Sequence, residues 1–315
     1  MRNILITGCA GFIGYNLTKF LLEKRYRIVG IDNLDNYYSI NLKKKRITEL
    51  KKYKNFQFIK LDIKKRISIK KLNSNFFLVI HLAAQAGVKS SVNNPRKTIS
   101  NNINGFLEIL EFVKRKRIKN VIYASSSTVY GHNEFPFSEN QKNNTPISIY
   151  GASKIANENM AYVYHNLYNI NFFGLRFFTV YGSSLRPDMA LYKFIKKIKL
   201  NKKIELFNYG KNMRDFTSVN DLNNKMIKII DYMNKNTKRK IFEILNFGNG
   251  KKISTLSAVK TISKILNKKT KIKLSKKHKD DMFVTISDTK KQKKIFGKLH
   301  YINFKDGIKK YLSSL

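Results

Sequence analysis

Short apolar runs alternate with longer amphipathic stretches along the first part of the chain. The apolar runs predict strands at residues 3–7, 27–31, 56–61, 77–82, 121–124 and 171–177. Between them, a helical periodicity predicts helices at residues 12–23, 42–53, 95–113 and 150–168. Strands that alternate with helices are typical of βαβ units around a parallel sheet. The pattern therefore predicts an α/β fold with a doubly wound, Rossmann-like parallel sheet.

The pattern becomes less regular beyond residue 189. It predicts helices at residues 189–200, 221–234 and 255–266, and short strands near 204–207 and 243–247. These segments indicate a smaller C-terminal α/β lobe, and no internal repeat or long low-complexity linker separates it from the first part. We therefore expect two interleaved domains, residues 1–180 and 181–315, with an approximate boundary.

The composition fits a globular protein but carries a large positive charge. The chain has 315 residues, 42% of them hydrophobic, which is enough to bury a sizeable core. A net charge of +43 would ordinarily suggest nucleic acid or an anionic membrane as partner. However, only 12 of the 63 basic residues are arginines, and the lysines are spread along the whole chain. Lys, Asn, Ile, Phe and Tyr are abundant and have A/T-rich codons, so we interpret the charge as genome composition and expect no nucleic-acid partner.

Two absences in the sequence narrow the class of protein. No run of about 18 uncharged apolar residues is present, so we expect no membrane-spanning segment. Cys9 is the only cysteine, which leaves neither a disulfide framework nor a cysteine cluster for a metal. We therefore expect a cytoplasmic protein without a metal site.

A glycine motif follows the first predicted strand directly and opens the first predicted helix. The segment TGCAGFIG places Gly8, Gly11 and Gly14 at the spacing G-x-x-G-x-x-G. We expect Gly8 to permit a tight turn, Gly11 to let the backbone approach a pyrophosphate, and Gly14 to allow close packing of helix and strand. The helix N-terminus would offer free N–H groups and a positive dipole end to the phosphates. The motif therefore predicts a dinucleotide site rather than a glycine-rich turn alone.

Carboxylates and small residues at later strand ends extend this site. Asp32 ends the second predicted strand, 18 residues after Gly14, where a carboxylate can accept hydrogen bonds from the adenosine ribose. It would repel a 2′-phosphate, so we expect NAD rather than NADP; a simple turn at Asp32 is the alternative. Asp62 ends the third strand, where it can meet the adenine edge. Ala83 and Ala84 end the fourth, where small side chains allow the dinucleotide to approach.

A tyrosine and a lysine begin the long helix that follows the fifth predicted strand. Tyr150 and Lys154 form Y-x-x-x-K, so their side chains lie on one helical face. A tyrosine base at neutral pH needs its pKa lowered by about 3 units, which a neighbouring ammonium and an oxidised nicotinamide can supply. Lys154 would also bond the nicotinamide ribose. Hydroxyls at the end of the fifth strand can bridge the substrate and Tyr150, and we favour Ser126 among Ser125, Ser126, Ser127 and Thr128.

Further motifs occur in the order HLAAQAGV, ASSSTVYG, YGASK, LRFFTVYG, RPDMA and RDFTSVNDL. Together with TGCAGFIG they resemble the extended short-chain dehydrogenase/reductases, from residue 1 to about 230 and more weakly to the end. The first motifs mark only this superfamily, whereas LRFFTVYG with RPDMA is similar to the branch that acts on UDP-hexuronates. The sequence departs from the family near residue 280, where Lys279, Asp280 and Asp281 replace the usual P-G-D.

The resemblance implies an NAD-dependent epimerase that acts on C4 of a UDP-hexuronic acid. It would convert UDP-glucuronate and UDP-galacturonate reversibly through a transient 4-keto sugar, with NAD tightly bound and regenerated in each cycle. Tyr150 would take the proton from the sugar O4 and later return it, with Lys154 and Ser126 as its catalytic partners. The implied cofactor site comprises Gly8, Gly11, Phe12, Ile13, Gly14, Asp32, Asn33, Asp62, Ile63, Leu82, Ala83, Ala84, Gln85, Asn102, Tyr150, Lys154 and Phe177.

The resemblance also implies a set of substrate contacts. Arg214 resembles the arginine that grips the UDP phosphates, a task that suits a guanidinium. Thr179 stands where many relatives that act on neutral sugars carry Asn. Arg176 and Arg186 occupy matching motif positions in a chain that is poor in arginine. The implied substrate site comprises Ser126, Ser127, Thr128, Thr179, Arg186, Met189 and Arg214.

Other activities remain open at this point. The neighbouring alternative is a 4-epimerase of UDP-glucose or UDP-N-acetylglucosamine, against which the RPDMA segment argues. A nucleotide-sugar dehydratase or decarboxylase would carry an acid just after the serine cluster, but no Asp or Glu follows before Glu134. A non-catalytic NAD-binding protein would not need Ser126, Tyr150 and Lys154 together.

The two long helices predicted at residues 95–113 and 150–168 carry more apolar residues than one sheet face needs. The resemblance implies a homodimer through a four-helix bundle made from this pair. A helix layer packed only on the sheet is the alternative.

Overall fold

The computed structural model describes residues 3–66, 72, 74–141, 145–276 and 282–315. The chain divides into two compact units. The first consists of Met1–Asn133, Lys142–Arg176 and Met226–Leu245, and the second of Glu134–Gln141, Phe177–Lys225 and Asn246–Leu315. In the described ranges, no helix is long and apolar enough to cross a membrane.

A seven-stranded sheet forms the centre of the first unit, with the strand order β10-β6-β5-β4-β1-β2-β3. Strand β1 pairs in parallel with both β2 and β4, and the pairs β2–β3 and β4–β5 are parallel as well. The strand order reverses between β1 and β4, which is where open α/β sheets bind ligands at the carboxyl ends of the strands. The strands are β1 (Asn3–Thr7), β2 (Arg27–Asp32), β3 (Phe56–Lys60), β4 (Phe76–His81), β5 (Asn120–Ser126), β6 (Asn171–Phe177) and β10 (Phe242–Phe247).

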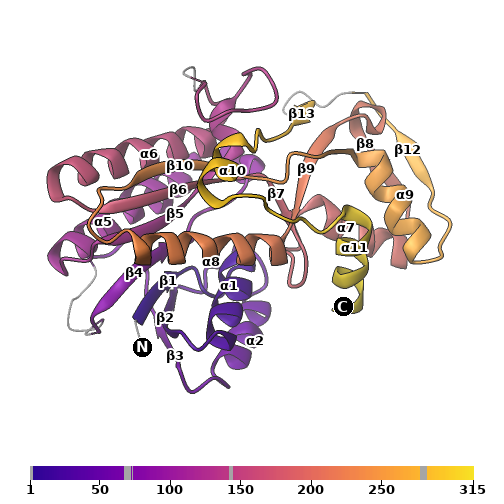
Figure 1. The fold of residues 1–315 in the computed structure, drawn as a ribbon. Helices are drawn as coiled ribbons and strands as arrows, with labels where there is room; N and C mark the ends of the chain where they lie inside the picture. The colour runs from indigo at the N-terminus through magenta and orange to yellow at the C-terminus, as the bar shows by residue number, and fades with distance from the viewer. Residues whose placement is uncertain (1–2, 67–71, 73, 142–144, 277–281) are drawn as a thin grey trace. The chain divides into compact units, whose positions relative to one another are not determined.

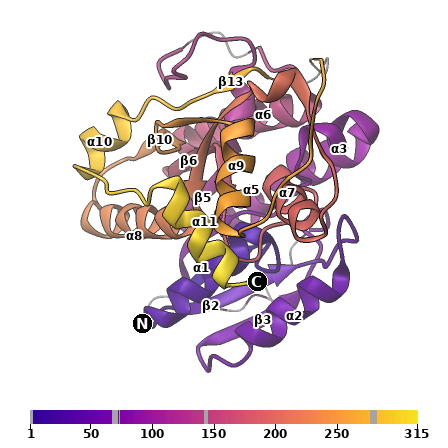
Figure 2. The same ribbon diagram turned by 90° about the vertical axis from the view of Figure 1, so that its right-hand side faces the viewer.

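Helices cover both faces of this sheet, which confirms the doubly wound α/β fold. Figure 1 shows α5 and α6 along one face, and Figure 2 places α1 and α8 on the other side of β5 and β6. A single helix was expected at residues 95–113. The structure has two α-helices there, α4 and α5, which are joined by a π-helical segment, Ser100–Asn104. The helices are α1 (Phe12–Glu23), α2 (Ile40–Leu50), α3 (Val88–Asn93), α4 (Pro95–Ile99), α5 (Gly105–Arg115), α6 (Ile149–Tyr168) and α8 (Val219–Lys235).

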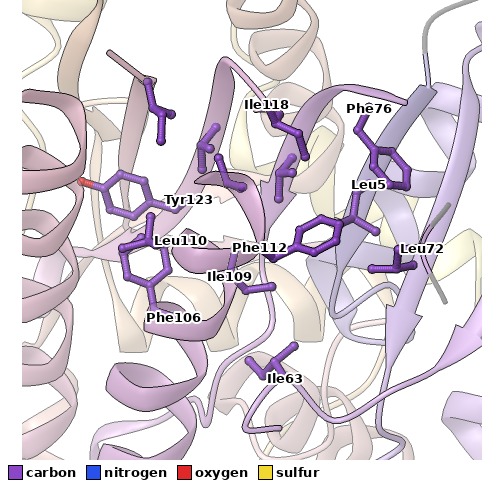
Figure 3. Close-up of a cluster of buried hydrophobic side chains, with 14 of the residues drawn as sticks. Leu5, Ile63, Leu72, Phe76, Phe106, Ile109, Leu110, Phe112, Ile118 and Tyr123 are labelled. Atoms are coloured by element: carbon purple, nitrogen blue, oxygen red, sulfur yellow. The ribbon is translucent and has the colours of Figure 1, made fainter. Parts of the chain in front are cut away.

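A buried apolar cluster fixes α5 on the sheet (Figure 3). Phe106, Ile109 and Phe112 recur every three residues along α5, so they face the same side, and all three are fully buried. The ring of Phe106 lies 5.3 Å from that of Tyr123 on β5. Leu5 of β1 belongs to the same cluster. The packing therefore joins α5 to the strands whose carboxyl ends carry the candidate site.

The position of β10 differs from the prediction. The strand near residues 243–247 was expected in the C-terminal lobe, but β10 is the edge strand of the seven-stranded sheet, beside β6. The backbone N–H of Phe172 donates to Ile241, and the N–H of Ile241 donates to the Asn171 side chain, so the start of β6 holds the chain that enters β10. The prediction was wrong because strand pairing between segments about 70 residues apart leaves no local periodicity.

Among the described residues, the second unit contains two small sheets, four complete helices, a short 3-10 turn and the first residues of α8. One sheet has the order β11-β9-β13 with β7 also paired to β9, and the other pairs β12 with β8. The strands are β7 (Thr179–Tyr181), β8 (Ile204–Leu206), β9 (Met213–Ser218), β11 (Lys252–Ser254), β12 (Ile272–Leu274) and β13 (Val284–Thr285). The helices are α7 (Ala190–Lys199), α9 (Thr255–Ile265), α10 (Lys290–Phe296) and α11 (Phe304–Ser313), together with the short 3-10 turn Phe207–Gly210.

Candidate active site

The glycine motif forms a tight loop between β1 and α1. Gly8 has φ +72°, in the left-handed region that favours glycine, and a Cβ there would lie 2.8 Å from the backbone nitrogen of Ala83. A Cβ on Gly14 would lie only 2.1 Å from the carbonyl oxygen of Gly8. That same oxygen accepts a hydrogen bond from the N–H of Gly11 at 2.9 Å. The loop therefore has no room for side chains at Gly8 or Gly14.

Gly11 has a different environment from the other two glycines. It is the N-cap of α1, and a Cβ on it would meet, within 4 Å, only the Gly8 carbonyl oxygen at 3.0 Å. As a glycine it has no side chain with which to cap the first N–H groups of α1, where Phe12 and Ile13 begin the helix. These N–H groups and the helix dipole suit a pyrophosphate that approaches the loop.

Asp32 at the end of β2 is buried and connects the glycine loop to the turn that follows. Its Oδ2 accepts a hydrogen bond from the N–H of Ala10 at 3.1 Å, and its Oδ1 accepts one from the N–H of Leu34 at 2.8 Å. Burial raises the pKa of Asp32 above its ordinary value, although Lys43 and the two N–H donors oppose that shift. The next residue, Asn33, accepts a hydrogen bond from the N–H of Asp35. Asp32 therefore organises the turn while its carboxylate lies beside the glycine loop.

Two buried basic residues of α2 hold this loop and were not predicted. Arg46 is 2% exposed, and its Nη1 donates to the carbonyl oxygen of Ala10 at 2.9 Å and to the Tyr38 hydroxyl at 3.0 Å. The Nζ of Lys43 donates to the carbonyl oxygen of Asp35 at 2.7 Å. Their spacing of three residues on an amphipathic helix was a usable signal, but it is hidden in the run KKKR.

The carboxyl ends of β1 and β4 are joined by the hydroxyl of Thr7. Its Oγ1 accepts hydrogen bonds from the N–H groups of Leu82 and Ala83, both at 3.1 Å, and lies 2.9 Å from Nδ1 of His81. Since these two N–H groups already use both lone pairs of the Thr7 oxygen, the hydroxyl proton is the one left for Nδ1, and the neutral ring then carries its proton on Nε2. Burial lowers the pKa of His81 to about 3, so the ring stays neutral. This network fixes the backbone of the expected cofactor residues Leu82 to Ala84.

Asn102, on the π-helical segment, links this backbone to α6. The N–H of Gln85 donates to Asn102 Oδ1 at 2.7 Å, and Asn102 Nδ2 donates to Gln85 O at 3.1 Å and to Ser153 Oγ at 3.0 Å. The side-chain amide of Asn102 is thus bonded within the protein at both ends, and the residue is 1% exposed. Asn102 places Gln85 and the start of α6 relative to each other.

The loop after β3 presents Asp62 and Ile63. Asp62 Oδ1 accepts a hydrogen bond from the N–H of Lys64 at 3.0 Å, and the Lys64 ammonium lies 3.5 Å from its Oδ2. Ile63 is 6% exposed. A Cβ added to Gly105 would lie 2.8 Å from the Cδ1 atom of Ile63. The glycine at the start of α5 therefore makes room for Ile63, which holds Asp62 at the rim of the sheet.

Tyr150 and Lys154 lie together in the first turns of α6. Ser148 caps this helix by accepting the N–H of Gly151 at 3.1 Å. The Lys154 Nζ lies 5.8 Å from the centre of the Tyr150 ring and donates to the carbonyl oxygen of Ala124 at 2.8 Å. Lys154 is fully buried, and burial lowers its pKa to about 8 against the opposing charge of Glu158. The helix therefore places an ammonium beside the phenol, as the Y-x-x-x-K spacing predicts.

The hydroxyl cluster after β5 separates into two groups. Ser126 Oγ accepts hydrogen bonds from the N–H of Thr128 at 3.2 Å and from its hydroxyl at 2.9 Å. Ser125 instead donates to Glu158 Oε1 at 2.6 Å and is 1% exposed. Ser127 begins the short 3-10 turn Ser127–Tyr130, against which the N-terminus of α6 packs at Gly151. The alternation of a strand thus turns Ser125 away from Ser126.

The remaining expected contacts belong to the second unit, in which each has a defined place. Phe177 packs edge to face on Phe247, and Thr179 lies opposite Phe216 in the β7–β9 pair. Arg186 forms a two-pronged ion pair with Asp188, with both N–O distances at 3.0 Å. Met189 is the N-cap of α7.

Arg214 lies on β9 next to Asp215, whose carboxylate forms hydrogen bonds with other segments of the chain. Its Nη1 donates to the Met213 carbonyl oxygen at 2.8 Å. Asp215 is fully buried and accepts hydrogen bonds from the N–H groups of Asn249 and Gly250 and from the hydroxyl of Ser287. Asp215 therefore ties the strand that carries Arg214 to the segments around Asn249 and Ser287.

Arg176, the arginine at the end of β6, forms a buried ion pair. It is 3% exposed, and its Nε and Nη2 bind the two carboxylate oxygens of Glu158 at 2.9 and 2.7 Å. Nε and Nη2 of Arg176 are therefore engaged inside the protein by Glu158. Glu158 itself was missed, although its spacing four residues after Lys154 was a signal.

Two further expectations concern the limits of the site. In the described part of the chain, no group of three or more His, Cys, Asp or Glu side chains is placed to hold a metal ion. The departure at Lys279, Asp280 and Asp281 lies outside the described residues.

Comparisons with known proteins show the family to which the chain belongs. The family model of the NAD-dependent epimerase/dehydratase family matches residues 4–244. An uncharacterised protein of Methanocaldococcus jannaschii is 43% identical, covering 98% of this chain and 95% of its own. The UDP-glucuronate 4-epimerase of Thermodesulfobacterium geofontis is 38% identical over the same shares of the two chains. The crystal structure of UDP-glucuronic acid 4-epimerase from Bacillus cereus, in complex with UDP-glucuronic acid and NAD, is 32% identical with a TM-score of 0.90, covering 99% of this chain and 98% of that one.

Proposed function

Because this chain belongs to the NAD-dependent epimerase/dehydratase family, we propose that it interconverts UDP-glucuronate and UDP-galacturonate by inverting C4. The observation that carries the proposal is the likeness, over nearly the whole chain, to proteins named as UDP-glucuronate 4-epimerases. The enzyme is an isomerase that keeps NAD bound, and the sugar passes through a transient 4-keto form. The phenol, ammonium and hydroxyl at the end of β5 and the start of α6 supply the groups that such a reaction needs.

The first unit fits NAD at the carboxyl ends of its strands. The loop around Gly8, Gly11 and Gly14 leaves space for a ligand on the side of Gly11, and the uncapped start of α1 suits the pyrophosphate. Asp32 would bind the adenosine ribose, and Asp62 with Ile63 would border the adenine. When bound there, NAD would supply the hydride acceptor and donor that inversion at C4 of the sugar needs. Asn33, Leu82, Ala83, Ala84, Gln85, Asn102 and Phe177 complete the proposed site, with Asn102 acting through Gln85 and Ser153.

Three side chains of the first unit would handle the proton. Tyr150 takes the proton from the sugar O4 as C4 is oxidised and returns it after the sugar has turned over. Lys154 stays charged beside the phenol, which stabilises the phenolate. Ser126 would hold the sugar O4. Its oxygen already accepts two hydrogen bonds from Thr128, which leaves its own proton to be donated.

Further side chains are proposed to recognise the substrate. Ser127 and Thr128 accompany Ser126, while Thr179, Arg186, Met189 and Arg214 are the proposed contacts from the second unit. Arg214 suits the UDP phosphates because a guanidinium binds two oxygens at once. Arg186 would act together with Asp188, because the two side chains are paired in the structure.

The proposal is tested by offering three sugars to the enzyme as purified, without added NAD. UDP-glucuronate, UDP-glucose and UDP-N-acetylglucosamine are incubated separately, and the products are separated by anion-exchange chromatography. We expect UDP-galacturonate from the first and little turnover of the other two. Conversion of only the neutral sugars would favour the alternative UDP-glucose or UDP-N-acetylglucosamine epimerase. Loss of water or of the carboxylate from the product would indicate a dehydratase or a decarboxylase instead.

We further propose that the enzyme is a homodimer through a four-helix bundle formed by α5 and α6. These helices lie side by side, and Tyr164 of α6 donates a hydrogen bond to Glu111 of α5 at 2.6 Å (Figure 1). Their outer side exposes apolar residues that one chain leaves uncovered: Leu107 is 41%, Val163 49% and Leu167 65% exposed. Val163 and Leu167 are four residues apart and lie on one face. An exposed apolar stripe of this kind supports pairing with a second copy.

The dimer is tested by placing charge on this stripe. We expect Val163→Glu combined with Leu167→Glu to reduce the mass in solution from twice 36.8 kDa to that of one chain, because two carboxylates would be buried at the interface. Light scattering coupled to gel filtration measures this mass. Leu200→Glu is the matched control, since Leu200 is 54% exposed but lies just after α7. A single-chain mass for the unmodified protein would refute the dimer.

We infer a cytoplasmic location from the state of the cysteine. Cys9 is a free thiol and fully buried in the glycine loop, where burial raises its pKa well above the ordinary value. A chain with one inert thiol and no disulfide is compatible with a reducing compartment.

A further inference from the structure

A buried ion pair lies directly behind the catalytic part of α6. Glu158 is 5% exposed, and its two carboxylate oxygens accept hydrogen bonds from Nε and Nη2 of Arg176 at 2.9 and 2.7 Å. Ser125, the neighbour of Ser126 on β5, donates to the same carboxylate at 2.6 Å. The Arg176 guanidinium also stacks 4.7 Å from the centre of the Tyr130 ring. Glu158 therefore connects three elements: α6, the end of β5 and the end of β6.

This carboxylate is one helical turn from the lysine of the proposed active site. Lys154 and Glu158 are four residues apart on α6, so their side chains lie on the same face. Lys154 is 1% exposed, and its Nζ donates a hydrogen bond to a neutral group, the Ala124 carbonyl oxygen. A buried ammonium costs much free energy unless a negative charge lies near it. Glu158 is the carboxylate placed to provide that charge.

We propose that Glu158 is a positioning residue that keeps Lys154 protonated beside Tyr150, with Arg176 and Ser125 holding its carboxylate in place. The inference rests on the function proposed above, because a charged Lys154 is what lowers the energy of the Tyr150 phenolate. Glu158 would contact neither the sugar nor the cofactor. It acts through Lys154 and, by way of Ser125, through the strand end that carries Ser126.

The other titratable groups near Lys154 or Glu158 cannot supply this negative charge. His81 on β4 is buried and neutral, with its pKa lowered to about 3, and it cannot stabilise an ammonium by charge. Tyr123 on β5 is fully buried with its pKa raised, so it is neutral as well. Arg176 on β6 is positive and opposes a second cation. Burial lowers the pKa of Lys154 to about 8, and Glu158 is the charge that resists this shift.

The test compares two variants that break the same ion pair. Glu158→Gln removes the negative charge, whereas Arg176→Gln leaves it unpaired, and both cost stability. We expect the pKa of Lys154 to fall by about one unit or more in Glu158→Gln and to rise in Arg176→Gln, because opposite charges nearby shift a pKa by such amounts. The readout is NMR of protein labelled at the lysine ¹³Cε position, with the Lys154 signal identified by its absence in Lys154→Arg.

The rate of epimerisation gives a second readout with a fixed sign. The charged form of Lys154 is the active one, and it is lost as the pH rises through its pKa. A lower pKa therefore moves the alkaline limb of kcat to lower pH in Glu158→Gln, and Arg176→Gln moves it to higher pH. Glu158→Asp keeps the charge and should restore most of the profile.

A purely structural ion pair would give a different result. Both variants would then lose stability to a similar degree and leave the pKa of Lys154 unchanged, or shift it in the same direction, and either outcome overturns the proposal. If Glu158→Gln does not fold, the double variant Glu158→Gln with Arg176→Gln replaces it. A lowered Lys154 pKa is expected there too, because Glu158 is nearer on the same helix, and an unchanged pKa overturns the inference. The NMR readout holds even if the unmodified enzyme epimerises no sugar, so failure of the proposed function is seen separately.

Discussion

Tyr150→Phe is expected to remove nearly all epimerase activity while leaving the cofactor bound. The substitution deletes one oxygen, which is the atom that takes the proton from the sugar O4. Loss of a general base typically lowers kcat by about 10²- to 10⁴-fold, and we expect an effect at the upper end because the same group must also return the proton. The ring of Tyr150 lies 5.8 Å from the Lys154 Nζ, and a phenylalanine ring keeps that packing.

The measurement combines turnover with cofactor content. We expect kcat with UDP-glucuronate to fall, whereas the NAD released from the purified protein by acid stays near that of the unmodified enzyme. Tyr162→Phe is the matched control, since Tyr162 lies on the same helix but is 54% exposed. A Tyr150→Phe enzyme with normal kcat would show that the base is another group. Loss of NAD together with activity would show that the hydroxyl serves binding rather than proton transfer.

Local patterns in the sequence predict the parts of the site that one strand and the following helix build alone. The glycine motif, its strand and its helix occupy neighbouring residues, so β1 and α1 begin and end where the periodicity placed them. Tyr150 and Lys154 were expected on one face of a helix, and that spacing is enough to bring their side chains together. Asp32 was expected at a strand end, with a simple turn as the alternative, and its carboxylate accepts hydrogen bonds from both the turn and the glycine loop.

Residues that act through distant segments were not predicted. Glu158 is bonded to Arg176, 18 residues later, and to Ser125, 33 residues earlier. Arg46 reaches Ala10, 36 residues earlier, from within a lysine-rich run that reads as solvated surface. Charge patterns report only spacing along a helix, and they do not show which face is buried in a chain with 63 basic residues. Strand β10 was misplaced for the same reason, since sheet order is a long-range property.

Gly14→Ala is expected to have the second-largest effect on activity and stability, because the new side chain clashes with the backbone of the glycine loop. The new Cβ would lie 2.1 Å from the Gly8 carbonyl oxygen and 2.8 Å from the Gly8 carbonyl carbon, and both atoms are backbone. The oxygen is also fixed by the N–H of Gly11, so relief requires a shift of the whole turn. Forcing extra volume into a packed site costs about 1–3 kcal/mol, and we expect the upper part of that range together with loss of bound NAD.

Two other glycines separate packing from cofactor contact. A Cβ on Gly11 meets only the Gly8 oxygen, at 3.0 Å, so Gly11→Ala should change the free energy of unfolding little. It should nevertheless weaken NAD binding, because the remaining free side of Gly11 is where the pyrophosphate would lie. Gly297→Ala is the control for strain without a contact, since a Cβ there meets no atom within 4 Å, whereas φ +71° with ψ −164° is nearly restricted to glycine and costs an alanine about 1–3 kcal/mol. Urea unfolding and NAD content measure the two effects. If Gly11→Ala held NAD as firmly as the unmodified chain, the cofactor would not approach this loop, and the glycine motif would serve packing alone.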